Sequence, residues 1–210
     1  MTRLARTPLC ALASLFLVVG LVSARAAAVP PSPTSSPVPQ WHLDIDKAMD
    51  AIGLEPGMVV GEAGAGDGYF TIPMARRVGA AGVVYANDIS TRALSSLEQR
   101  SAREGLANVH TVAGDVNDPR FPRRDLQLVV VVHAFHDFSS PVEWLVNLKG
   151  YLRPGATVAI IDRDPAQGAE AHFWPRERIV RHANEAGYEL VKATDDFSAH
   201  LILVFKPNRP

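Results

Sequence analysis

Three glycines at alternate positions follow an acidic residue in the segment 58–70, which reads MVVGEAGAGDGYF. The apolar residues before Glu62 predict a short strand and the residues from Tyr69 onward predict a helix, so the glycines lie in the turn between them. Glycine adopts backbone conformations that other residues avoid and lets a ligand approach the main chain. The first turn of the helix also offers free N–H groups. This segment therefore predicts a binding site for a nucleotide-like cofactor.

The spacing of these glycines separates two classes of cofactor site. The dinucleotide fingerprint is G-x-G-x-x-G, whereas the glycines here run G-x-G-x-G directly after Glu62. A nicotinamide-dependent oxidoreductase would also need a catalytic Tyr/Lys pair or its equivalent, which we do not find. A glycine loop can also be a plain structural turn, so the chemistry has to be supported by residues elsewhere in the chain.

Acidic residues follow the next two predicted strands. Asp88 ends the strand 83–88, where its carboxylate can accept hydrogen bonds from both hydroxyls of a ribose or can cap the next helix. Asp115 follows the strand 109–113, where it can contact a ligand or form a turn. Ligands of an open parallel sheet bind outside the carboxyl ends of its strands, so both aspartates are expected near the glycine loop.

Two histidines and an aspartate follow the fourth predicted strand: His133, His136 and Asp137. Histidine can act as a general base because its unperturbed pKa lies near neutrality. The same three residues can instead contribute metal ligands, although the spacing is awkward outside a helix and no fourth ligand is evident. A purely structural loop is the third interpretation. We assign His133 and His136 as candidate bases and assign no metal ligands.

Strands and helices alternate along the chain, which predicts a doubly wound α/β/α sandwich of three layers with a mostly parallel sheet. The continuous apolar run LQLVVVV is typical of a strand buried on both faces. Pro154 and Gly155 predict a turn. The predicted strands cover 58–62, 83–88, 109–113, 125–133, 157–161, 188–193 and 201–205. The predicted helices cover 44–54, 69–78, 91–104, 141–152 and 176–186.

These segments together resemble class I S-adenosylmethionine (SAM)-dependent methyltransferases, in particular small bacterial methyltransferase-domain proteins. Besides the glycine loop, the likeness rests on EPGMVV before it, GVVYANDI after it, and YLRPGATVAIID and AGYELV nearer the end, in that order. It extends from about residue 40 to 206. The resemblance implies a Rossmann-like methyltransferase fold with a seven-stranded, mostly parallel sheet and an antiparallel last strand, and S-adenosyl-L-methionine as the cofactor.

The resemblance also implies roles for individual residues. Glu62 and the glycine loop would hold the amino-acid end of the cofactor, or Glu62 would orient the loop. Asp88 would bind the ribose, Ile89 would contact the adenine, and Asp115 would accept a hydrogen bond from the adenine amino group. The complete predicted cofactor site consists of Glu62, Gly64, Ala65, Gly66, Gly68, Asp88, Ile89, Asp115 and Val116.

The activity implied is methyl transfer to a small-molecule acceptor that the sequence does not identify, with His133 or His136 as the base. Trp144 and Phe135 are candidate walls of the acceptor site, and the segment 172–178 is a candidate lid. Gly61 departs from the family pattern, because a branched apolar residue is usual there, and it is expected to loosen the strand. The alternative functions are a non-catalytic SAM-fold binding protein and an NAD(P)-dependent Rossmann oxidoreductase.

The N-terminal residues predict export. Two arginines, an apolar stretch at 9–22 and the small-residue site Ala24-Arg25-Ala26 indicate a signal peptide over 1–28, with an uncleaved anchor as the alternative. The Pro/Ser-rich segment 29–40 predicts a linker, and 41–210 the methyltransferase domain. We therefore expect a periplasmic or secreted protein whose mature form has no membrane span and no cysteine. The net charge of −1 predicts no strong attraction to nucleic acid, so no nucleic-acid partner is expected, although a near-neutral total is compatible with a local basic patch. The oligomeric state is not predicted.

Overall fold

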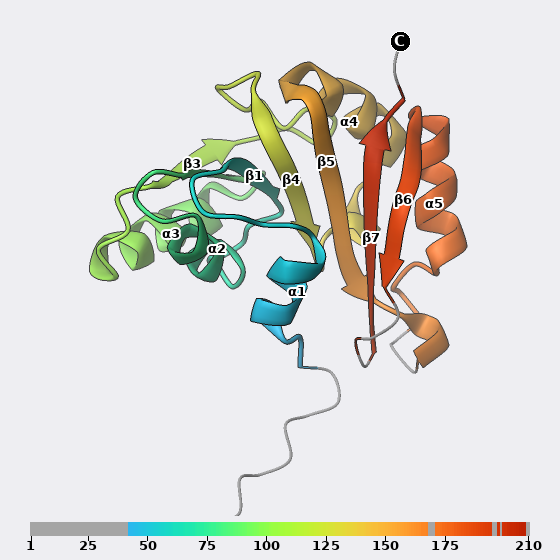
Figure 1. The fold of residues 1–210 in the computed structure, drawn as a ribbon, viewed down its shortest axis with the longest axis horizontal. Coiled ribbons are helices and arrows are strands. Elements are labelled where there is room, and N and C mark those ends of the chain that lie inside the picture. The colour runs from blue at the N-terminus through green and yellow to red at the C-terminus, as the bar shows by residue number, and fades with distance from the viewer. Residues whose placement is uncertain (1–41, 168–170, 195–196, 198, 209–210) are drawn as a thin grey trace, which may run out of the picture. The chain divides into compact units, whose positions relative to one another are not determined.

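The computed structural model describes residues 42–167, 171–194, 197 and 199–208. Within them, seven strands form one sheet in the order β3-β2-β1-β4-β5-β7-β6 (Figure 1). Strands β1 to β5 pair in parallel, and β7 pairs antiparallel with both β5 and β6. The predicted Rossmann-like methyltransferase sheet with its antiparallel last strand is therefore confirmed. The strands are β1 Val59–Ala63, β2 Val83–Asp88, β3 Val109–Ala113, β4 Leu126–Val132, β5 Leu152–Arg163, β6 Tyr188–Thr194 and β7 His200–Pro207.

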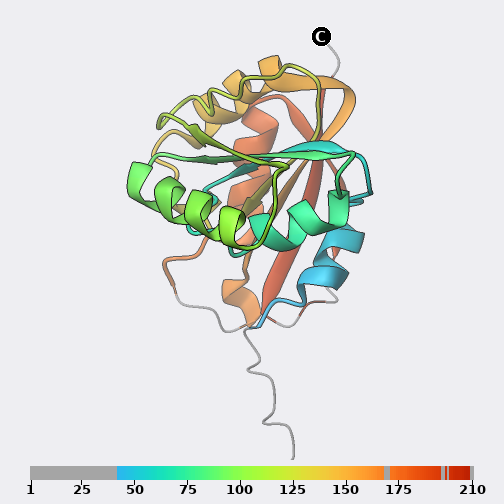
Figure 2. The ribbon, with the colours of Figure 1, turned by 90° about the vertical axis from the view of Figure 1, so that its left-hand side faces the viewer.

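Helices cover both faces of this sheet and complete the three-layer sandwich. Figure 2 shows α2 and α3, in green, on one side of the strands and α4, in yellow to orange, on the other. Across the parts of the chain that the structure describes, no helix has the length and apolar character needed to cross a membrane. The predicted signal peptide (1–28) and linker (29–40) lie outside the described residues. The helices are α1 Ile45–Ala51, α2 Thr71–Val78, α3 Thr91–Arg103, α4 Pro141–Leu148 and α5 Arg176–Glu185.

The central strand β4 contributes to two cores at once. Val129 and Val131 pack in the cluster that contains the apolar residues of α4 and α5. Leu128 and Val130 pack in the cluster that contains those of α1 and α2. Each such buried side chain stabilises the fold by about 1.5–3 kcal/mol. This burial on both faces explains the uninterrupted apolar run in the sequence.

The order of the strands locates the site. The chain moves outward from β1 to β2 and β3, and then returns to place β4 on the other side of β1. The loops that follow β1 and β4 therefore lead to helices on opposite faces of the sheet. A crevice opens between such loops, and it is where ligands bind in doubly wound sheets.

The sequence-based prediction of the fifth strand was too short. Strand β5 begins at Leu152, and the predicted turn at Pro154 and Gly155 lies inside it. Leu126 pairs with Leu152 but Leu128 pairs with Thr157, so the extra residues form an irregularity in β5, where Gly155 has φ +81°. The predicted helix 141–152 also ends early, because α4 stops at Leu148 and a 3₁₀ turn over Lys149–Tyr151 follows.

The expectation that Gly61 loosens β1 was wrong. A Cβ at this position would lie 2.7 Å from the ring carbon Cζ of Phe121, so the aromatic ring takes the space of the missing side chain. Phe121 is buried and packs edge-on against Tyr151, with 5.9 Å between ring centroids. The glycine therefore permits close packing of a distant loop on β1.

Candidate active site

The glycine loop between β1 and α2 has the backbone conformation for which glycine is suited. Gly64, Gly66 and Gly68 have φ values of +71°, +55° and +92°. A Cβ at Gly64 would lie 2.4 Å from the Cβ of Ala134, whereas one at Gly66 would meet no atom within 4 Å. The loop is therefore packed tightly against the end of β4 at Gly64 and is open at Gly66.

Asp88, at the end of β2, connects this loop to helix α3. Its Oδ2 accepts a hydrogen bond of 2.9 Å from the N–H of Gly66, and its Oδ1 accepts one of 2.8 Å from the N–H of Ser90. A carboxylate oxygen has two lone pairs, so each oxygen can accept a second hydrogen bond from a ligand hydroxyl. Asp88 can therefore hold the loop in place and bind a ribose at the same time.

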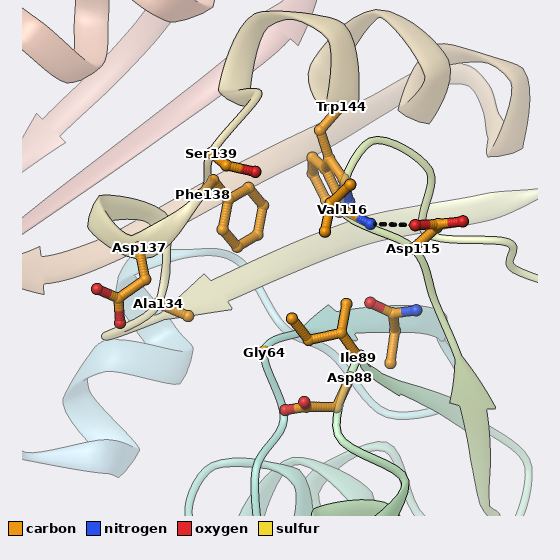
Figure 3. A pocket seen from close by; sticks show the side chains of 11 residues that line it. Gly64, Asp88, Ile89, Asp115, Val116, Ala134, Asp137, Phe138, Ser139 and Trp144 are labelled. Atoms are coloured by element: carbon orange, nitrogen blue, oxygen red, sulfur yellow. Dashed lines mark hydrogen bonds between the residues drawn. The ribbon is translucent and has the colours of Figure 1, made fainter.

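A cavity of about 260 Å³ opens beside this carboxylate. Figure 3 shows Asp115, Val116 and Trp144 toward one end and Asp137 and Ala134 toward the other, with Gly64 and Asp88 below. Ile89 and Val116 are 65% and 52% exposed, which is unusual for large apolar side chains, and a planar apolar ligand would cover both. The lining residues are Gly64, Asn87, Asp88, Ile89, Asp115, Val116, Ala134, Asp137, Phe138, Ser139 and Trp144.

The charge of the cavity has one sign. Three of its described lining residues, Asp88, Asp115 and Asp137, are acidic, and none of them is basic. Asp115 also forms an ion pair of 2.6 Å with Arg120, and its Oδ1 accepts a hydrogen bond of 2.8 Å from the N–H of Val116. Opposite charges at 4 Å attract by about 1 kcal/mol in water and about 4 kcal/mol near a protein surface. The cavity therefore favours a cationic ligand over a pyrophosphate.

Glu62 is part of β1 and does not line the cavity. It is buried, and its Oε2 accepts a hydrogen bond from the hydroxyl of Thr71 at the start of α2. Burial raises the pKa of Glu62 from 4.5 to about 8, the Thr71 hydrogen bond opposes this shift, and the charge of Asp88 adds to it. Of its two predicted roles, this position favours orientation of the loop over direct contact with the cofactor.

His133 follows β4 in an unusual conformation and does not line the cavity. Its φ is +50°, which is rare for residues other than glycine, and its N–H donates a 2.8 Å hydrogen bond to the carbonyl of Ile161. The imidazole stacks on His200 at 5.0 Å and on Tyr69 at 6.3 Å between ring centroids. Burial, followed by the charge of His200, lowers the pKa of His133 from 6.5 to about 4. Such a ring is neutral at pH 7 and is a weak base.

His136 has a different environment, although it lies only three residues further along. Its Nδ1 is 2.8 Å from Oδ2 of Asp162, a fully buried carboxylate at the end of β5. Its Nε2 is 3.6 Å from Oδ2 of Asp137. Burial lowers the pKa of His136, but the hydrogen bond to Asp162 and the charges of Asp162 and Asp137 outweigh burial, so the pKa is raised overall.

The structure gives no support to the metal interpretation of these histidines. No group of three or more His, Cys, Asp or Glu side chains suited to a metal ion occurs in the regions that the structure describes. His133 stacks on rings, while His136 is directed to Asp162, so the two imidazoles do not converge.

Two further predictions about the acceptor side need correction. Phe135 is fully buried in the core and cannot form the wall of an acceptor site. Trp144 does line the cavity, but together with Val116 and Ile89 rather than beside the histidines. In the candidate lid 172–178, Phe173 and Trp174 are buried, and Phe173 packs on His136 at 4.5 Å between ring centroids. No residue of this segment lines the cavity, so it covers His136 instead.

Five of the predicted cofactor-site residues line the cavity: Gly64, Asp88, Ile89, Asp115 and Val116. The other four, Glu62, Ala65, Gly66 and Gly68, do not line it, and neither His133 nor His136 lines the cavity. Sequence reasoning offered Asp137 only as an alternative metal ligand and assigned no role to Phe138, Ser139 or Asp162. Asp162 carried a detectable signal, because it is a polar residue at the carboxyl end of an apolar strand. The roles of all these residues in binding or catalysis stay predictions.

Residues 60–155 match the family model of a methyltransferase domain. The chain is 31% identical over 83 residues to nocamycin O-methyltransferase of Saccharothrix syringae, covering 40% of this chain and 30% of that protein. It is 27% identical over 124 residues to 2-phytyl-1,4-naphtoquinone methyltransferase of Trichormus variabilis, covering 59% and 54% of the two chains. The chain thus spans about half or less of the length of these curated relatives.

The fold is also that of solved methyltransferases. A SAM-dependent methyltransferase from Aquifex aeolicus superimposes with a TM-score of 0.72 at 23% identity, covering 77% of this chain and 88% of that one. The matched family and the fold support S-adenosyl-L-methionine as the cofactor. The residues present fit this molecule, because the carboxylates suit its sulfonium and ammonium groups and the exposed Ile89 and Val116 suit its adenine.

Proposed function

We propose that this protein is a SAM-dependent methyltransferase that acts on a small-molecule acceptor. The observation that carries the proposal is the cavity beside the glycine loop, whose charged lining among the described residues consists of aspartates. That electrostatic character favours a sulfonium nucleoside over a dinucleotide, whose pyrophosphate would be repelled. The names of the matched relatives, which act on nocamycin and a naphthoquinone, favour a small acceptor.

The residues have distinct tasks in this proposal. Asp88 holds the ribose and the N–H of Gly66 together, and Ile89 and Val116 enclose the adenine beside Asp115. The end of the cavity near Gly64, Ala134 and Asp137 receives the sulfonium and the amino-acid tail. SAM supplies an activated methyl group. The rigid carboxyl end of the sheet supplies proximity and orientation, which contribute much of the acceleration of a displacement reaction.

Isothermal titration calorimetry with SAM and its demethylated product tests the cofactor site. We expect both to bind the wild-type protein, and Asp88→Ala to weaken binding about 10- to 150-fold, since hydrogen bonds to a charged group contribute about 1.5–3 kcal/mol. Glu98→Gln, on the exposed side of α3, is the matched control and should bind normally. Binding of NAD or NADP in preference to SAM would instead support the oxidoreductase alternative.

We further propose that residues 1–28 direct export, on the basis of their charged start, apolar stretch and small-residue site. A fusion of these residues to a reporter that is active only outside the cytoplasm should be active, and an inactive fusion contradicts export. SAM is made in the cytosol, so an exported domain needs another supply. Export therefore favours, as the second candidate, a SAM-fold protein that binds its ligand without turnover.

A further inference from the structure

Three side chains form a row at the carboxyl ends of β4 and β5. Asp162 is fully buried and lies 2.8 Å from Nδ1 of His136, whose Nε2 lies 3.6 Å from the carboxylate of Asp137. Asp137 is 79% exposed in its side chain and lines the cavity, so the row leads from the core to the cavity. The ring of His136 is also held by Phe173 and by His172, at 4.5 Å and 5.4 Å between ring centroids.

The orientation of the imidazole follows from this arrangement. A buried carboxylate is most stable when it accepts a hydrogen bond. Nδ1 of neutral His136 therefore carries the hydrogen, and this N–H donates a hydrogen bond to Asp162. Nε2 then has a lone pair that faces the carboxylate of Asp137, while the His136 side chain is only 6% exposed and does not itself line the cavity. Asp137 is at the end of the cavity that receives the sulfonium in the proposed function, so Asp137 connects this nitrogen with the proposed site of methyl transfer.

We propose that His136 is the general base of the reaction, that Asp162 is its positioning residue, and that the acceptor is a phenol or enol hydroxyl. This inference rests on the proposed methyltransferase function. Nε2 of His136 takes the hydroxyl proton while the acceptor oxygen attacks the methyl carbon. An oxygen–methyl bond forms, the methyl–sulfur bond breaks with its electron pair going to sulfur, and the imidazolium later releases its proton to water.

The base and the aromatic side chains together favour one class of acceptor. A carboxylate is already ionised near neutral pH and needs no base, whereas an alkylammonium ion and a phenol must each lose a proton before attack. A phenol or enol is largely protonated near neutral pH and becomes a strong nucleophile only when the proton leaves. The aromatic side chains beside the row, Phe138 in the cavity and Phe173 on His136, suit a flat acceptor.

An NMR titration of the imidazole groups tests the row without any acceptor. The charged groups that face His136 are Asp162 from β5, Asp137 from its own turn, His172 from the segment before α5, and His133 from the end of β4. We expect Asp162→Asn to lower the titration midpoint of His136 by about 1 pH unit, since a paired carboxylate favours the imidazolium. Asp137→Asn, at an exposed position that tolerates change, should lower it less. An unchanged midpoint in both variants overturns the role of the two aspartates.

Methylation of phenols of different acidity tests the role of His136 in catalysis. His136→Gln should slow methylation of 4-methoxyphenol about 100-fold, the usual contribution of a general base. It should hardly change methylation of 4-nitrophenol at pH 9, because that phenol is already ionised. Asp162→Asn should reproduce this difference to a smaller degree, and Asp162→Glu should recover part of the activity. His110→Gln, at an exposed position of β3, is the control that should leave both rates unchanged.

Equal losses for both phenols in His136→Gln would show that the ring is structural and would overturn the proposal. Methylation of benzylamine but of no phenol would overturn the class of acceptor. The result also separates the two levels of inference. A protein that binds SAM in the calorimeter but methylates no phenol contradicts the hydroxyl acceptor alone, whereas one that binds no SAM contradicts the proposed function itself.

Discussion

Two halves of this site are built in different ways. The cofactor half consists of the carboxyl ends of β1, β2 and β3 with the glycine loop, and the histidine half consists of the ends of β4 and β5 with the start of β7 (Figure 1). In the cofactor half, backbone conformation and one carboxylate, Asp88, do most of the positioning. In the histidine half, His133, His136 and Asp162 are positioned by other side chains.

The difference shows how neighbouring residues acquire opposite properties. His133 and His136 lie in one turn, yet burial lowers the pKa of His133 whereas Asp162 and Asp137 raise that of His136 against burial. The cofactor half depends on steric conditions that a single methyl group violates and on one buried carboxyl group, that of Glu62. In the histidine half, burial and neighbouring charges together set the pKa of each imidazole. Each prediction below tests one side of this contrast.

The largest combined effect, on stability and on cofactor binding, is expected from Gly64→Ala. The new Cβ would lie 2.4 Å from Ala134 and would hold alanine at φ +71°. Left-handed backbone costs about 1–2 kcal/mol and overpacking about 1–3 kcal/mol, so the free energy of unfolding should fall by about 3 kcal/mol. SAM binding should be lost, because Ala134 lines the cavity. Urea denaturation and calorimetry measure the two effects.

The matched control for this substitution is Gly66→Ala. Its φ is +55°, but its Cβ would meet no atom within 4 Å, so it should lose only the backbone contribution of about 1–2 kcal/mol. Equal losses of stability in the two variants would show that contact with Ala134 is unimportant. The tight packing of the loop on β4 would then not explain the glycine at position 64.

The sequence was sufficient to predict which residues meet around the glycine loop. The glycine loop, Asp88 and Asp115 are close to one another because parallel strands place their ends at one edge, so a local motif plus topology located them. The histidine half was not predictable to the same degree. Phe135 and Trp144 were expected together in an acceptor site, but the turn after β4 buries Phe135, whereas α4 places Trp144 at the cavity. The hydrogen bond between His136 and Asp162 joins residues 26 positions apart, and no local pattern encodes it.

A second prediction concerns the pH dependence of the cofactor half. The pKa of Glu62 is raised from 4.5 in the unfolded chain to about 8 in the folded protein, so the folded state retains a proton that the unfolded state loses. Its stabilisation is present below pH 4.5 and is lost as the pH rises to about 8. The free energy of unfolding should therefore fall by up to about 1.4 kcal/mol per pH unit in this range, relative to Glu62→Gln.

Urea denaturation of both proteins between pH 5 and 8 measures this difference. The glutamine side chain in Glu62→Gln keeps an oxygen that can accept the hydrogen bond from Thr71, so the variant should fold and differ chiefly in its lack of titration. Glu55→Gln, at an exposed turn, should retain the pH dependence of the wild type. If the free energy of unfolding varies with pH in the same way in the wild type and in Glu62→Gln, Glu62 is ionised in the folded protein. Direct contact of Glu62 with the cofactor would then be the better of its two predicted roles.

The smallest effect is expected in the histidine half and has the opposite sign. The pKa of His133 falls from 6.5 to about 4 on folding, so between these values the unfolded chain binds a proton that the folded protein excludes. Stability is therefore lost as the pH falls from 6.5 to 4, by about 1 kcal/mol once partial exposure is considered. His133→Asn removes this titration, and asparagine tolerates the positive φ of this position. In urea denaturation between pH 4 and 6.5, the midpoint of His133→Asn should therefore vary less than that of the wild type. Between pH 7 and 8 the midpoints of the two proteins should vary with pH in the same way. Acid sensitivity that is unchanged in His133→Asn but disappears in His200→Asn would show that the excluded proton belongs to His200, the other ring of the stacked pair. The contrast with His136 would then apply to His200 and not to His133.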